Sequence, residues 1–181
     1  TDVSAASGIS KAEGGYGLTV VAADFDNDGW PDIYVACDST PALLFRNNHD
    51  GTFTERALEN GAALSDDGMV QAGMGLGIGD VRLQGSLDVF KTHYANDTPA
   101  LYVNDGKGNF RDLTLRSGLA VETRFVNWGT GVSDLDNDGN PDILNCNRKC
   151  AICRLDPCLI SLALRTASHV RKFIGEFGTS F

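Results

Sequence analysis

The sequence predicts an all-β fold, a partial β-propeller made of four-stranded antiparallel blades. Three observations lead to this prediction. A motif of alternating aspartates occurs twice, hairpin-like segments recur at fixed spacing, and no segment of residues 1–144 has the apolar period of a helix. Short β-rich segments, four to a repeat, are typical of propeller blades. An ordinary β-sandwich is the alternative, but it would not need the same loop at a fixed spacing.

Four strands are expected in each unit. Two of them flank the aspartate motif, and the next two flank an Asn/Asp/Gly turn, which is typical of a hairpin. In the first unit these segments read LTVVAADF (18–25), DIYVACD (32–38), PALLFRN (41–47) and GTFTERA (51–57). The hairpin returns as ALYVN (100–104) and GNFRDLT (108–114), at an offset of 57 residues.

The repeat also reaches the start of the chain. Asp2 and Gly8 match Asp112 and Gly118 at an offset of 110 residues, so we expect the chain to open on the tail of another copy. Residues 1–145 then hold about two and a half blades. An unclosed set of blades exposes strand edges, so we expect a fragment or a chain that pairs with further blades.

The aspartate motif reads DFDNDGWPDI from Asp24 and DLDNDGNPDI from Asp134. Carboxylates at alternate positions point to one centre when the loop curls, and the glycine at the sixth position permits the turn. Oxygen ligands in this number favour Ca²⁺, and the helices and the twelfth-position Glu of an EF-hand are missing. A solvated acidic turn is the alternative. The expected ligands are Asp24, Asp26, Asp28, Trp30 (by its backbone carbonyl), Asp32, Asp134, Asp136, Asp138, Asn140 (by its carbonyl) and Asp142.

A degenerate copy, DVRLQGSLDV, begins at Asp80. Arg82 and Gln84 replace its two middle carboxylates. We expect the Arg82 guanidinium to lie between Asp80 and Asp88 and to supply the charge of an ion, so that this loop binds no metal. The alternative is that Arg82 points to solvent.

At these residues the chain resembles the FG-GAP/VCBS repeat family, the calcium-loop β-propellers known from integrin α-subunit heads. Within it, the sequence is most similar to the secreted or cell-surface propellers of the cartilage acidic protein and ASPIC/UnbV type. The resemblance covers about residues 1–146. It implies four-stranded blades, calcium in the loop between the first two strands of a blade, and an extracellular, cell-surface or periplasmic location. Members of the family mostly bind or adhere.

A second part, residues 146–181, differs in composition. Residues 1–144 carry 9 Lys and Arg against 22 Asp and Glu, whereas residues 145–181 carry 6 against 2. Four cysteines fall here, namely Cys146, Cys150, Cys153 and Cys158. They are consistent with a small zinc site, with disulfides, or with a divergent end that belongs to no functional unit. Residues 159–177 are predicted to form an amphipathic helix that docks on exposed blade surface or lies on a membrane.

Charge and motifs narrow the function. The net charge of −9 disfavours nucleic acid and anionic membranes as partners, and no apolar run is long enough to span a bilayer. We find no nucleophile–base arrangement, and His49, His93 and His169 are not placed as catalysts. We therefore expect a calcium-binding adhesion module, not an enzyme, whose partners are a protein or glycan ligand or further blades. The alternative is a fragment of a calcium-dependent propeller lyase or hydrolase acting on polysaccharide.

Overall fold

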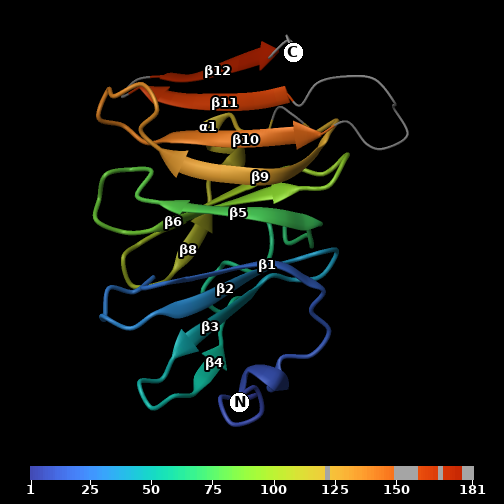
Figure 1. Ribbon diagram of the computed structural model, residues 1–181, viewed down its shortest axis with the longest axis vertical. Coiled ribbons are helices and arrows are strands. Elements are labelled where there is room, and N and C mark those ends of the chain that lie inside the picture. Colours follow the sequence, from blue (N-terminus) through green and yellow to red (C-terminus); the bar gives the residue numbers. More distant parts are fainter. Residues whose placement is uncertain (121–122, 149–158, 167–168, 177–181) are drawn as a thin grey trace.

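The computed structural model describes residues 1–120, 123–148, 159–166 and 169–176. These residues form three four-stranded antiparallel sheets, each a meander in chain order, which confirms the all-β prediction (Figure 1). The first sheet comprises β1 (Gly17–Ala23), β2 (Asp32–Cys37), β3 (Leu43–Asn47) and β4 (Phe53–Glu55). The second comprises β5 (Gly73–Gly79), β6 (Asp88–His93), β7 (Ala100–Asn104) and β8 (Phe110–Asp112). The third comprises β9 (Val126–Ser133), β10 (Asp142–Arg148), β11 (Leu159–Thr166) and β12 (His169–Glu176).

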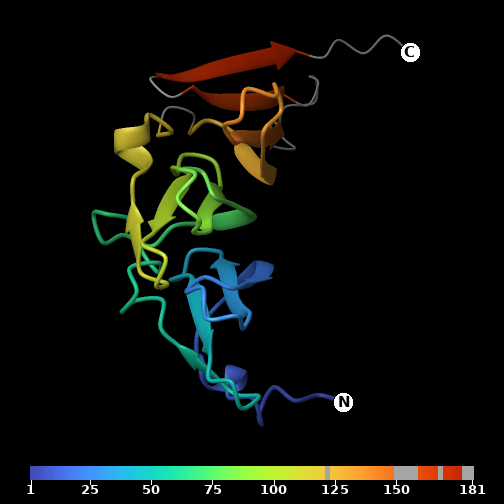
Figure 2. The same cartoon turned by 90° about the vertical axis from the view of Figure 1, so that its left-hand side faces the viewer.

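The sheets stack face to face in chain order along the long axis of the molecule (Figures 1 and 2). Their first strands are neighbours, because β5 contacts both β1 and β9. The second sheet is therefore covered on both sides, and every residue of β6 and β7 is buried. Two apolar clusters hold the stack together. One includes Phe25 and Phe110, whose rings meet edge to face at 5.7 Å, and the other includes Phe90, Leu101 and Ile143.

Glycines in β5 permit the close approach of β9. A Cβ added at Gly75 would overlap the backbone oxygen of Trp128, and one added at Gly79 would lie 2.6 Å from Val132 Cγ1. The third sheet thus packs onto a strip of bare backbone on the second. The glycine-rich segment GMGLGIGD (73–80) is thus a packing surface.

The repeat extends to the loops after each outer strand. The carboxylates of Asp2, Glu55 and Asp112 each accept the backbone N–H two residues later. Glycines follow at Gly8, Gly61 and Gly118, all with positive φ. The N-terminal segment therefore has the conformation of a unit's tail, as the alignment predicted.

These tail loops also reach the next sheet. The N–H of Phe53 in β4 donates to Ser7 O at 2.8 Å, and the N–H of Phe110 in β8 donates to Asn60 O at 2.7 Å. Ser7 and Asn60 belong to the two preceding tails. Each of these outer strands is thus braced by the loop that comes before its own sheet.

The helix predicted over residues 159–177 is wrong. The structure has strands β11 and β12 there, and β11 pairs with β10. In the sequence, Ile160, Leu162 and Leu164 alternate with smaller or polar residues, a period of two that suits a strand. Pairing satisfies the edge of β10, and such tertiary context overrides helix propensity. The described residues therefore hold three sheets, where about two and a half blades were expected.

The boundary expected at residue 145 falls inside β10, which runs to Arg148. Cys146 lies in this strand, whereas Cys150, Cys153 and Cys158 lie outside the described residues. The three proposals for the cysteines therefore stay predictions. In the described part of the chain, no helix combines the length and apolarity needed to cross a membrane.

Candidate metal centres

The two aspartate motifs lie in equivalent places. One forms the loop between β1 and β2, and the other forms the loop between β9 and β10. Both loops turn through left-handed residues at the same positions, with φ of 59° at Asn27 and Asn137, 88° at Gly29 and 86° at Gly139. Asn and Gly are the residues that adopt this conformation at least cost, which explains the shared DNDG sequence.

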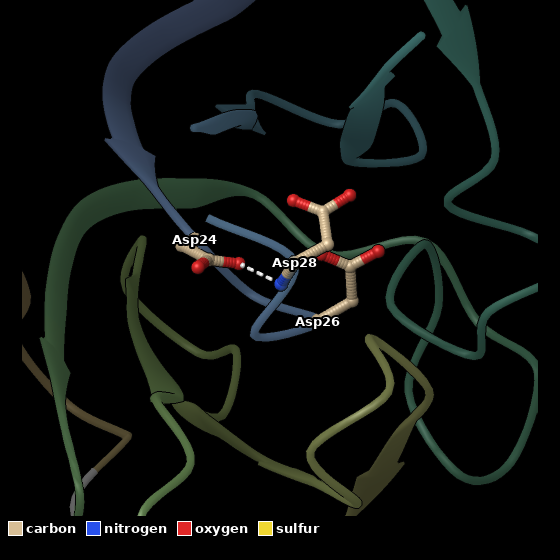
Figure 3. A group of neighbouring side chains, drawn as sticks. All are labelled: Asp24, Asp26 and Asp28. Atoms are coloured by element: carbon tan, nitrogen blue, oxygen red, sulfur yellow. Dashed lines mark hydrogen bonds between the residues drawn. The ribbon is translucent and has the colours of Figure 1, made fainter. Parts of the chain in front are cut away.

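In the first loop, Asp24 organises the turn. Its Oδ1 accepts the N–H of Asp28 at 3.1 Å and its Oδ2 accepts the N–H of Gly29 at 2.8 Å. The carboxylates of Asp24, Asp26 and Asp28 gather on one side of the loop (Figure 3). One oxygen from each lies within 4.8 Å of the others, close enough to share a single cation.

The second loop repeats this arrangement. Asp134 accepts the N–H groups of Asp138 at 3.1 Å and Gly139 at 2.9 Å, and oxygens of Asp134, Asp136 and Asp138 also lie within 4.8 Å of one another. Asn140 directs its amide nitrogen to Asp138 Oδ1 at 3.0 Å. The predicted carboxylates at positions 1, 3 and 5 are thus brought together in both loops.

The ninth-position aspartates do not join these groups of three. Asp32 and Asp142 are 1% and 2% exposed. Asp32 Oδ1 accepts the N–H of Asn47 in β3 at 2.9 Å, and Asp142 Oδ2 accepts the N–H of Leu135 at 2.9 Å. Both residues therefore tie the loop to the backbone around it.

Burial leaves two oxygens in the first loop without a hydrogen bond. Asp26 Oδ1 and Asp32 Oδ2 are buried and accept no hydrogen bond. An unpartnered buried carboxylate oxygen is costly, and a cation relieves that cost. The donors are all oxygens, the type that Ca²⁺ prefers, so the residues of this loop fit a calcium ion.

Desolvation and crowded charge raise the pKa of one carboxyl group in each loop. Burial raises the pKa of Asp32, and the charges of Asp28 and Asp24 raise it further, against hydrogen bonds from backbone N–H groups. Desolvation raises the pKa of Asp136, and the neighbouring Asp138 adds to this. Repulsion of this kind is what a bound cation removes.

The degenerate loop has an arginine in place of the missing carboxylates. Arg82 Nη2 lies 3.1 Å from Asp88 Oδ1, and Nε lies 3.3 Å from Asp88 Oδ2. Asp80 instead accepts the N–H groups of Gln84 and Gly85. Arg82 therefore points inward, as expected, but it pairs with Asp88 and not with both aspartates. The absence of metal from this loop stays a prediction.

Two residues near the first loop were not predicted. Arg46, in β3, forms ion pairs with Asp26 and Asp32. His49 Nε2 lies 2.6 Å from Asp28 Oδ2, and its ring stacks on Trp30 at 5.3 Å. Aligning the two repeat units marks Arg46 as unusual, because the equivalent position of the second unit holds the apolar residue Val103.

Comparison with known proteins agrees with this architecture. The FG-GAP-like repeat family matches residues 24–90, a range that begins at the first acidic loop. Cartilage acidic protein 1 of Homo sapiens is 32% identical over 146 residues, which is 78% of this chain and 20% of that protein. The Xenopus tropicalis protein of the same name is 30% identical over 142 residues, 76% of this chain and 20% of its own length. The chain thus spans a fifth of the length of these curated relatives. Residues 24–90 thus match the FG-GAP-like repeat family, and about three quarters of this chain is similar in sequence to part of cartilage acidic protein 1.

Proposed function

We propose that this chain is a calcium-binding β-propeller segment that serves as an extracellular binding or adhesion module. Calcium has a structural role in the proposal. It joins the first two strands of a sheet through Asp24, Asp26 and Asp28, and Asp32, which lies outside this group of three, adds its Oδ2 when the ion binds. The second loop uses the counterparts of these residues. A binding role is preferred to catalysis because no nucleophile–base pair accompanies these loops in the sequence.

One observation carries the proposal. The same group of three carboxylates occurs at the same place in two sheets, and in the first loop Asp26 and Asp32 hold buried oxygens that accept no hydrogen bond, although Arg46 forms ion pairs with both carboxylates. An acidic turn meant only for solvent would not require buried oxygens without hydrogen bonds. The partner is proposed to be a protein or glycan ligand or further blades, at the cell surface or outside the cell.

Thermal unfolding with and without calcium tests the structural role. A single site filled at 100 times its Kd adds about 2.7 kcal/mol to the free energy of unfolding, which raises Tm by about 5–10 °C for a chain of this size. EDTA should remove the increase. The double variant Asp26→Ala with Asp136→Ala should show almost none of it.

The control for lost charge is Glu13→Ala with Glu59→Ala, because both side chains are exposed and lie outside the acidic loops. This variant should keep the calcium-dependent increase in Tm. An unchanged Tm of the unmodified protein in millimolar calcium would refute the proposal. For the binding role, retention on immobilised glycans or matrix proteins should be lost in EDTA.

A further inference from the structure

Two arginines reach the ninth-position aspartate of an acidic loop, and they do so differently. Arg82 belongs to its own loop, 80–88, and is fully engaged. It donates to both oxygens of Asp88, to Ser86 Oγ at 3.5 Å and to Asn104 O at 2.5 Å. This guanidinium is a permanent part of the second sheet, since its hydrogen bonds satisfy the buried carboxylate.

Arg46 engages the first loop much less completely. Its Nη2 contacts Asp26 Oδ2, and its Nε lies 3.3 Å from Asp32 Oδ2. Nevertheless Nε makes no hydrogen bond, and neither do Asp26 Oδ1 and Asp32 Oδ2. The arginine thus supplies positive charge to this loop without satisfying its oxygens.

Strand register explains why the first loop alone has such a residue. In the register of β2 and β3, Arg46 lies opposite Asp32, one step beyond the pair formed by Ile33 and Phe45. Val103 and Leu164 hold the same register position in the second and third sheets. Arg46 also lies outside the loop it contacts, so all four carboxylates of that loop are retained.

The third loop has no comparable cation among residues 1–120 and 123–146, whose side chains the structure describes. No ion pair to Asp134, Asp136, Asp138 or Asp142 occurs among them. Within these residues the three loops form a series, with an arginine built into the second, an arginine from a neighbouring strand in the first, and none at the third.

We infer that Arg46 is a tethered counter-cation that competes with calcium for the first loop. It neutralises Asp26 and Asp32 in the metal-free protein and must leave those oxygens when the ion binds, because both cations use the same carboxylates. This inference rests on the proposed calcium function. It follows that the first loop fills at a higher calcium concentration than the third, so one chain holds two calcium sites of graded affinity.

Calcium titration calorimetry on the purified chain and on Arg46→Met tests this. The unmodified protein should show a weaker and a tighter site, and the variant should bind at the weaker site about tenfold more tightly. Arg56→Met is the matched control, because Arg56 is a nearby exposed arginine paired with Glu59 outside the loop. It loses the same charge and should change the affinity less than about threefold.

A second variant, Arg46→Lys, keeps the charge on a single ammonium group. Its calcium affinity at the weaker site should lie between those of the unmodified protein and Arg46→Met. This variant also guards against misfolding of Arg46→Met, since it keeps a cation on the same strand. Two sites with affinities unchanged in both variants would overturn the inference and leave the calcium function standing. No calcium bound to the unmodified protein or to any variant would overturn both proposals.

Discussion

Lys91 carries an amino group in the interior of the second sheet, and its replacement should stabilise the protein. The residue is 2% exposed, and its Nζ lies 3.3 Å from Tyr102 Oη and 5.2 Å from the ring centroid. Burial lowers the pKa of Lys91 from 10.5 to about 8, although the charges of Asp97 and Asp112 oppose the shift. The folded state therefore disfavours the ammonium form.

The size of the effect follows from the shift. The pKa of Lys91 differs by about 2.5 between the unfolded and folded states, which corresponds to about 3.5 kcal/mol at about 1.4 kcal/mol per pKa unit. Because the folded pKa of Lys91 is the lower one, the unfolded chain binds more protons between pH 8 and 10.5. The loss of unfolding free energy caused by burying Lys91 is complete below pH 8, becomes smaller as pH rises through this window, and disappears above it.

Lys91→Met keeps the length of the side chain and removes the charge. We expect it to raise the free energy of unfolding at pH 7 by about 1–3 kcal/mol, after allowing for the lost hydrogen bond. Tyr102 Oη retains a partner, since it also donates to Leu64 O at 3.1 Å. Urea unfolding at pH 7, 8, 9 and 10, at constant calcium, should show the gap to the unmodified protein shrinking as pH rises.

Lys107→Met is the control, because Lys107 is exposed in the β7–β8 hairpin. It should show no such narrowing of the gap between pH 8 and 10. A Lys91→Met protein that is less stable than the unmodified chain at pH 7, or a gap that does not change with pH, would refute the reasoning.

Two further substitutions test the packing between and within the sheets. Arg82→Met leaves the fully buried Asp88 without its counter-ion, so the free energy of unfolding measured in urea should fall by about 3 kcal/mol. Adding Asp88→Asn should recover part of that loss. Equal stabilities of the single and double variants would contradict the pairing. Gly75→Ala places a Cβ against Trp128 O, so it should lower the free energy of unfolding by about 1–3 kcal/mol. In Gly131→Ala the Cβ would meet nothing within 4 Å, so the loss should be less than about 1 kcal/mol.

The acidic loops could be predicted from sequence because their geometry is local. The turn depends on residues such as Asn27 and Gly29, and the carboxylates that meet are two positions apart. Arg46 could not be predicted in this way, because strand register between β2 and β3 brings it to Asp32 from 14 residues away. Local spacing carries no information about a partner supplied across a hairpin.

In the C-terminal segment, local sequence was likewise insufficient to predict the secondary structure. Residues 159–177 contain enough apolar residues to satisfy a helical period, and the alternation around Leu162 satisfies a strand period as well. The choice depends on β10, whose open edge offers hydrogen bonds that only a strand can take. The change of composition near Cys146 also predicted a boundary there, whereas β10 continues through it.

The tail loops couple the outer edges of successive sheets. If the first sheet and its trailing loop come apart, the amide of Phe110 loses Asn60 as its acceptor and the outer edge of the second sheet frays. If the second sheet opens first, Asn60 loses the same hydrogen bond, whereas the amide of Phe53 keeps Ser7, because that acceptor lies earlier in the chain. Protection of Phe110 from hydrogen exchange therefore reports on the loop before its own sheet as well as on that sheet.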